Sequence, residues 1–299
     1  MTDRLEAMSI LLAVVEAGSL SAGARALRMP LATVSRKVAE LESGLGAELV
    51  IRSARGLTLT EVGAAYLEAT KRILEDVAEA ERVASGEFTA PKGTLTLTAP
   101  IVFGRLHVLP VVIDFLKAHP DVNIRFEQSD RPVSLHEEHI DLAVRIGSLP
   151  DSSLMARRLG EVRQVVCASP AYLARNGQPT HPEELSDHRC ITFRNLMAPD
   201  RWHFGRGREE IDVPIRSRLV VNTAEAAISA AAADLGLTRV LSYQVSDAVN
   251  DGRLVTILAP FEPEPWPVSF VYPPRGQVPQ KLRAFLSFAA PRISDVLSR

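Results

Sequence analysis

The hydrophobic pattern changes near residue 90 of this 299-residue chain. Before that point apolar residues recur at helical spacing, and after it short strand-like apolar runs alternate with helical segments. The stretch between the two parts, Gly86 to Gly93, reads GEFTAPKG and is rich in residues that break regular structure. We therefore expect three parts: a small helical domain at 1–59, a linker helix and hinge at 60–90, and a larger α/β domain at 91–299.

The first part of the chain predicts three short helices. The first runs from about Leu5 to Val15 and ends before Gly18. Ser19 or Ser21 can cap the second helix, because a serine hydroxyl accepts a hydrogen bond from a free backbone N–H in the first turn. Pro30 is suited to the entry of the third helix, where its missing N–H is not needed.

The third helix has two faces of different chemistry. Its apolar stripe consists of Val34, Val38, Leu41 and Leu45. The opposite face begins with short side chains and continues with Arg36, which suits a helix that enters the major groove tip first. A plain three-helix bundle with a solvated polar face fits the same spacing, so the helix pattern alone leaves both interpretations open.

A small hairpin with two arginines follows these helices. Residues 48–51 and 57–59 are predicted strands, and the turn between them carries Arg52 and Arg55, where they can reach phosphates or the minor groove. The formal net charge of the whole chain is −2. The basic side chains from residue 25 to residue 55 are Arg25, Arg28, Arg36, Lys37, Arg52 and Arg55, against Glu40, Glu42 and Glu48. The positive charge is therefore local, and it accompanies the predicted DNA-binding unit.

A long helix is predicted from a Thr60 cap to about residue 85. Its apolar positions follow steps of four and three, as in a coiled coil: Val62, Tyr66, Ala69, Ile73, Val77, Ala80 and Ala84. This pattern favours self-pairing of two chains, and the competing interpretation is a helix that packs on its own chain.

The stretch from Ser19 to Glu68, with its segments VSRKVAELE and LTLTEVG, resembles the winged helix-turn-helix of LysR-type transcriptional regulators. The resemblance implies promoter DNA, a small-molecule effector and RNA polymerase as partners, and a homodimer or homotetramer. It implies these DNA-binding residues: Pro30, Leu31, Ala32, Thr33, Ser35, Arg36, Lys37, Arg52 and Arg55. Many relatives carry glutamine where this chain has Leu31, and an apolar side chain there cannot donate to a base edge.

The remaining two thirds of the chain predict an α/β domain with mainly parallel sheets. The residue pattern fits one lobe or two. The order of elements is similar to the two-lobed effector domain of the same regulators, which looks like a periplasmic solute-binding protein. That resemblance implies a first lobe at about 91–162 and 268–299 and a second at about 163–267.

A ligand site is expected where strands end beside the crevice between the lobes. Free N–H groups after the first strand, near Thr98, would favour an anionic group, so we expect a small carboxylate-bearing or otherwise polar effector. The predicted ligand-binding residues are Thr98, Ala99, Pro100, Ile101, Ile146, Gly147, Phe193, Arg194, Asn222 and Thr223. Ordinary capping or packing is the alternative role for each of them.

Several other kinds of function lack their sequence signals. We find no nucleophile elbow, phosphate-binding loop, dinucleotide fingerprint or HExxH motif, so we predict neither an enzyme nor a cofactor. The segment HEEHID, His136 to Asp141, is the nearest approach to a metal cluster and is better explained as a surface loop. A solute-binding or transport-associated protein is the alternative function, but it would carry a signal peptide and no basic N-terminal unit.

Two further expectations concern the cysteines and the cellular location. Cys167 and Cys190 lie in apolar strand-like runs and are predicted to be buried thiols, with a redox-sensing pair as the alternative. The chain has no apolar run of about 18 residues, and its first segment carries acidic residues around its apolar centre. We therefore expect a cytoplasmic protein with no membrane span.

Overall fold

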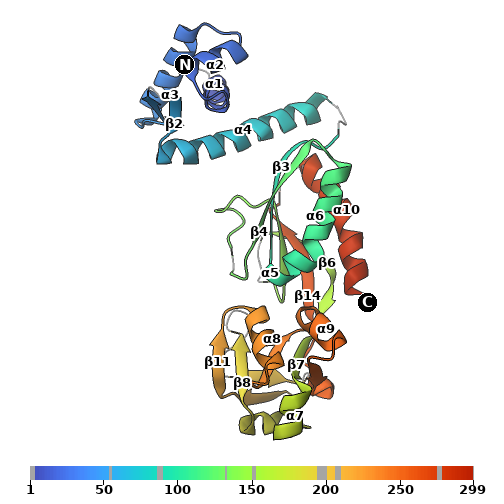
Figure 1. The fold of residues 1–299 in the computed structure, drawn as a ribbon. Helices are drawn as coiled ribbons and strands as arrows, with labels where there is room; N and C mark the ends of the chain where they lie inside the picture. The colour runs from blue at the N-terminus through green and yellow to red at the C-terminus, as the bar shows by residue number, and fades with distance from the viewer. Residues whose placement is uncertain are drawn as a thin grey trace. The chain divides into compact units, whose positions relative to one another are not determined.

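The computed structural model describes residues 4–53, 56–85, 90–131, 133–149, 153–193, 201–205, 210–274 and 278–298. The chain divides into two units, Met1–Thr89 and Ala90–Arg299, which are described separately below (Figure 1).

The N-terminal unit contains three short helices, a two-stranded hairpin and a long helix. Its elements are α1 (Arg4–Glu16), α2 (Leu20–Ala26), α3 (Leu31–Leu45), β1 (Val50–Ser53), β2 (Gly56–Leu59) and α4 (Glu61–Ser85). The predicted caps are present: the Ser19 hydroxyl accepts a hydrogen bond from the N–H of Ala22, and the Thr60 hydroxyl accepts one from the N–H of Gly63. Gly46 ends α3 in the left-handed conformation that favours glycine.

The apolar stripe of α3 faces the core of this unit. Val34, Val38 and Leu41 are buried in one cluster with Leu11 of α1, while Leu45 at the end of the helix is 36% exposed. The predicted stripe is therefore buried along α3 except at its last residue, Leu45.

The start of the hairpin is tied closely to the helices on either side. The Glu42 carboxylate on α3 accepts hydrogen bonds from the N–H groups of Leu49 (2.8 Å) and Val50 (3.1 Å). The first turn of α4 passes directly over Leu49: a Cβ added to Gly63 would lie 1.9 Å from the Leu49 carbonyl oxygen. The spacing from α3 through the hairpin to α4 is thus fixed by contacts to the backbone of Leu49 and Val50.

The long helix α4 presents apolar side chains in two directions. Gly63, Leu67 and Thr70 are buried, and Leu67 belongs to the core cluster of the N-terminal unit. Within the predicted coiled-coil seam, Val62 and Ile73 remain 56% and 41% exposed. The helix therefore packs partly on its own chain and keeps an outward apolar stripe, and pairing of two chains through that stripe stays a prediction.

Among its described residues the C-terminal unit contains two five-stranded sheets, and the first of them forms lobe I. Its elements are β3 (Gly93–Ala99), α5 (Ile101–Phe103), the π-helix η1 (Gly104–Val108), α6 (Leu109–Ala118), β4 (Val122–Gln128), β5 (Leu142–Ile146), β6 (Met155–Val162), β14 (Trp266–Tyr272) and α10 (Gln280–Leu297). The strand order is β4-β3-β5-β14-β6. Helices α6 and α10 lie side by side on one face of this sheet and bury its main core (Figure 1).

The second sheet forms lobe II. Its strands are β7 (Gln164–Ala168), β8 (Cys190–Phe193), β11 (Ser217–Val221), β12 (Leu237–Leu241) and β13 (Val255–Ile257), in the order β11-β8-β12-β7-β13. The helical elements are α7 (Pro170–Asn176), η2 (Pro182–Asp187), α8 (Ala224–Ala232), α9 (Ser242–Asn250) and η4 (Ala259–Phe261), and a separate hairpin consists of β9 (Arg201–Phe204) and β10 (Ile211–Pro214).

Both large sheets are mixed, which corrects the expectation of mainly parallel sheets. In lobe I, β14 pairs antiparallel with β5 and β6, and in lobe II, β12 and β13 pair antiparallel with β7. The reason is that the chain passes from lobe I to lobe II directly after β6 and returns directly into β14, so these strands need no helical crossover. Strand β6 was not predicted, because its first four residues are exposed and include two arginines, as is usual for an edge strand.

The two cysteines lie on opposite faces of the lobe II sheet. Cys167 of β7 pairs with Thr238 of β12, and Cys190 of β8 pairs with Leu237 of the same strand, so β12 runs between them. Two strand spacings correspond to about 10 Å, beyond the roughly 7 Å between Cα atoms that a disulfide can bridge. Cys167 and Cys190 also belong to different core clusters. The structure therefore favours two separate buried thiols over a redox-sensing pair.

We expect neither cysteine to react with a thiol reagent such as DTNB while the protein is folded. Burial raises the pKa of both thiols to about 12, which leaves a thiolate fraction of only about 10⁻⁴ at pH 8. Absorbance at 412 nm should show no rapid reaction in buffer and two reacting thiols in guanidinium chloride. Rapid reaction of either thiol in the native protein would contradict this placement.

Among the described residues, no single helix is long and apolar enough to cross a membrane, and the pair α1 and α2 passes that test only jointly, by length and composition, with a bend of 115° between them.

Candidate nucleic-acid interface and ligand cavity

The tip of α3 carries the predicted base-contacting side chains on its outer surface. Pro30 precedes the first helical residue, and Leu31 is 49% exposed. Ala32 is also exposed and Thr33 is half-buried, whereas Val34 is fully buried against the other helices. The first turn therefore offers small or apolar side chains to a groove while its inner side is fixed by the core.

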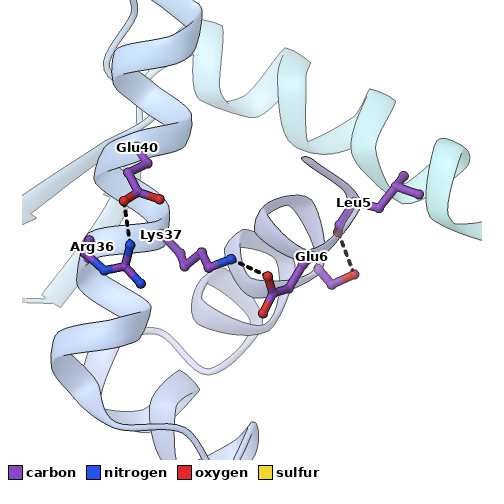
Figure 2. A network of polar contacts seen from close by, with 6 residues as sticks. Leu5, Glu6, Arg36, Lys37 and Glu40 are labelled. Carbon is purple, nitrogen blue, oxygen red and sulfur yellow. Dashed lines mark hydrogen bonds and ion pairs between the residues drawn. The ribbon is translucent and has the colours of Figure 1, made fainter. Parts of the chain in front are cut away.

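Arg36 lies one turn further along the same outer face. Its guanidinium group donates to the Glu40 carboxylate at 2.7 Å, and the Arg36 side chain remains 62% exposed (Figure 2). An exposed ion pair of this spacing contributes only about 0.3–0.5 kcal/mol, so Arg36 can exchange this partner for a base or phosphate at little cost.

Lys37 lies in a different environment from Arg36. Its ammonium group forms an ion pair with Glu6 of α1, and its side chain is only 15% exposed (Figure 2). In this placement the charge points toward α1 and away from the face that carries Arg36. This favours a role for Lys37 in holding α3 against α1.

The hairpin places Arg52 beside α3. Arg52 is exposed in β1, opposite Leu57 of β2, and its guanidinium group donates a long hydrogen bond of 3.4 Å to the Ser35 hydroxyl. Arg52 and Ser35 thus share one surface with Arg36. Arg55, the other arginine predicted at this tip, lies outside the described residues.

The larger unit contains a cavity of about 1100 Å³, lined mainly by residues of lobe I and also by Leu241 and Tyr243 of lobe II. It extends from the ends of strands β3 and β5 to the face of the sheet that the β4–β5 loop covers. Ligand pockets in proteins usually measure about 300–1,000 Å³, so this volume is sufficient for a small organic molecule.

Three of the ten predicted ligand-binding residues line this cavity, namely Pro100, Ile146 and Gly147. Thr98, Ala99 and Phe193 are buried at 1–3% exposure, and the Thr223 hydroxyl caps α8 by accepting from the N–H of Ala226. Ile101 is half-buried and Asn222 is exposed, and neither lines the cavity; Arg194 lies outside the described residues. The role of the ten residues in ligand binding stays a prediction.

The backbone N–H expected to attract an anion has a partner within the protein. The N–H of Ile101, where α5 begins, donates to the Asp130 carboxylate at 3.0 Å. Burial raises the pKa of Asp130, the Ile101 N–H opposes that change, and the charge of Glu225 raises the pKa further. Two carboxylates, one from each lobe, therefore influence this end of the cavity and disfavour an anionic group there.

Side chains that the sequence analysis missed make up much of the cavity wall. They include Asp130 and His136 from the β4–β5 loop, Arg145 of β5, Tyr243 of α9 and Trp266 of β14. One signal was available, because Arg145 is a charged residue inside the otherwise apolar strand LAVRI. The others converge from distant parts of the chain, and no local pattern marks them.

The two lobes interlock beside this cavity. Val102 of lobe I belongs to the core cluster of lobe II, and Leu241 of lobe II belongs to that of lobe I. The ring of Tyr243 packs edge-on against Phe103 at 5.3 Å and against His107 at 5.5 Å. Burial lowers the pKa of His107, so this aromatic contact favours a neutral imidazole.

Within the part of the chain that the structure describes, no three or more His, Cys, Asp or Glu side chains gather in a way that could hold a metal ion.

Family models match both units of the chain. Residues 5–64 match the bacterial regulatory helix-turn-helix protein of the lysR family, and residues 89–293 match the LysR substrate binding domain.

Individual proteins resemble the chain over nearly its whole length. An HTH-type transcriptional regulator of Xanthomonas campestris pv. campestris is 34% identical over 298 residues, which cover 98% of this chain and 87% of the relative. The structure of CrgA, a LysR-type regulator from Neisseria meningitidis, is 30% identical with a TM-score of 0.62 and covers 98% of this chain and 99% of that one. The full-length virulence activator AphB of Vibrio cholerae is 29% identical with a TM-score of 0.61, and the match covers 96% of this chain and 98% of AphB.

These relatives are regulators and not enzymes, in agreement with the sequence-based prediction, and they lend no support to a solute-binding or transport protein. The winged helix-turn-helix, the two-lobed α/β unit and the matches across both of them lead to one conclusion. The chain belongs to the LysR family of transcriptional regulators.

Proposed function

We propose that the protein binds a promoter sequence as a dimer, or as a pair of dimers, and that a small molecule in the lobe I cavity changes how it binds. The observation that carries the DNA-binding part is the shared surface of α3 and the hairpin. Leu31, Ala32 and Arg36 lie on the outer face of one helix, and Arg52 lies beside it at Ser35.

This surface fits the two kinds of contact that specific DNA binding needs. Small side chains at a helix tip allow close approach to the major groove, and an arginine behind them can make a bidentate contact to guanine. An arginine on the adjacent hairpin supplies charge for the phosphate backbone or the minor groove. One such head contacts few base pairs, so specific binding calls for two heads. The exposed stripe of Val62 and Ile73 on α4 supports their pairing.

The two-lobed unit supports control by a ligand. A molecule that binds one arrangement of the lobes more tightly than another shifts the population toward that arrangement. Such a change would rearrange the contacts between the lobes, namely those of Val102, Leu241 and the Tyr243 ring. Contact with RNA polymerase follows from the family resemblance and stays a prediction.

The DNA-binding proposal can be tested by selecting duplexes from a random library with the full chain. We expect enrichment of a partly palindromic site, because two identical heads read two half-sites. Affinity for that site should fall by about 10³- to 10⁵-fold between 50 and 200 mM salt if six to ten phosphates are contacted. Sequencing of the selected pool measures the enrichment, and fluorescence anisotropy measures the affinity at each salt concentration. No enrichment, or an affinity that does not change with salt, would contradict the proposal.

A further inference from the structure

The part of the cavity beneath the β4–β5 loop differs chemically from its strand-end part. We call it the loop chamber and define it by its lining residues Ser134, His136, Arg145, Ala156 and Val271. The loop is packed onto the sheet through Leu135 and Ile140, which form a buried cluster with Ala143 and Val271. The chamber is therefore a built cavity between the sheet and a docked loop.

Arg145 supplies the positive charge of the loop chamber. It lies on β5 opposite Ser269 of β14, and its side chain shares a face of the sheet with Ala143, two residues earlier. Its guanidinium group donates to the Val133 carbonyl oxygen at 2.8 Å. Burial lowers the pKa of Arg145, and the charge of Glu138 opposes that change.

The hydrogen bonding of this guanidinium group is incomplete among the residues that the structure describes. A guanidinium group has five N–H donors, and the one bond that we find is to a neutral carbonyl, with no carboxylate in ion-pair contact. A half-buried cation with unused donors beside a cavity is suited to a bidentate anion. The Ser134 and His136 side chains that line the same chamber can add further hydrogen bonds.

We propose that the loop chamber binds the carboxylate of a small organic anion through Arg145, with the apolar body of the ligand directed toward Leu154 and Val271. This inference rests on the proposed effector function and assigns the class of ligand. The apolar lining on this side of the sheet includes Leu154 and Val271, which suits a planar or aliphatic body. The strand-end part is unfavourable for the carboxylate, because Asp130 already holds the Ile101 N–H and Glu225 adds negative charge.

Three probes with the same ring and different charge test the proposal: benzoate, benzamide and benzamidine. Isothermal titration calorimetry on the full chain should give tighter binding of benzoate than of the other two. In Arg145→Met we expect benzoate affinity to fall about ten- to hundredfold, as for the loss of a charged hydrogen-bonded pair, and benzamide affinity to change much less. Arg145→Lys keeps the cation and should keep the preference for benzoate over benzamide in weakened form.

Arg157→Met is the matched control. Arg157 is exposed on β6 opposite Phe270, a residue of the helix-covered core, so it lies away from the loop chamber. This variant should bind benzoate like the wild type. If Arg145 only anchors the loop, Arg145→Met will weaken benzoate and benzamide equally, which would overturn the proposal. Tighter binding of benzamidine than of benzoate, or no benzoate binding by the wild type, would also overturn the proposal. The regulatory function is tested separately, by whether the wild type selects a DNA site.

Discussion

Replacing Arg36 with alanine should remove most of the preference of this protein for its selected DNA site over random duplex. A bidentate contact between arginine and guanine contributes about 1–3 kcal/mol of discrimination, so the specific-to-random affinity ratio should fall about 5- to 150-fold. Arg36 can leave its partner for a DNA base at little energetic cost, because it is 62% exposed and that partner, Glu40, lies on the same helix. Competition binding with labelled selected duplex and unlabelled random duplex measures the ratio.

Two other variants separate the possible effects of charge on this surface. Arg52→Ala should weaken binding to selected and random duplex by similar factors and reduce the salt dependence, if Arg52 contacts the phosphate backbone as proposed. Lys37→Met should act mainly through stability, since Lys37 is paired with Glu6 of α1. The assignment of α3 as the base-reading helix would be wrong if Arg36→Ala left the ratio unchanged while Arg52→Ala reduced it.

Replacing Gly63 with alanine should destabilise the N-terminal unit strongly. The added Cβ would lie 1.9 Å from the Leu49 carbonyl oxygen and 2.7 Å from its carbonyl carbon, and backbone atoms cannot move aside as a side chain can. Overpacking of this kind costs typically 1–3 kcal/mol, and a backbone obstacle favours the upper end, about 3 kcal/mol. We expect the Tm of this unit to fall by more than about 10 °C in differential scanning calorimetry.

Gly44→Ala provides the matched control within the same unit. Gly44 also lies in a helix, but a Cβ added there meets nothing within 4 Å. Alanine forms helices better than glycine by up to about 1 kcal/mol, so this variant should be neutral or slightly more stable. The close approach of α4 to Leu49 would be refuted if the two variants had the same Tm.

The N-terminal unit could be predicted from sequence because its determinants are local. Periodic apolar residues, the Ser19 and Thr60 caps and the Pro30 entry each act within one or two turns of their own helix. The outer face of α3 followed from the same periodicity. The pairing of Lys37 with Glu6 did not, because it depends on how α1 packs against α3.

The larger unit was predicted less completely because its arrangement depends on contacts between distant residues. Strand direction in the two sheets follows from where the chain passes between lobes, which no short pattern reveals. The expected anion site near Thr98 was argued from free backbone N–H groups, and Asp130, 29 residues after Ile101 along the chain, takes the first of them. Arg145 was visible as a charge within an apolar strand, but its cavity is formed only when the β4–β5 loop docks.

We expect two identical heads, joined through α4, to read two half-sites on one face of the DNA. The most direct measurement is the affinity of the full chain for its selected duplex after five or ten base pairs are inserted between the half-sites. Five base pairs turn one half-site to the opposite face, so affinity should fall to that of a single half-site, and ten base pairs should restore part of it. Equal affinity for the original and the five-base-pair duplex would contradict the claim.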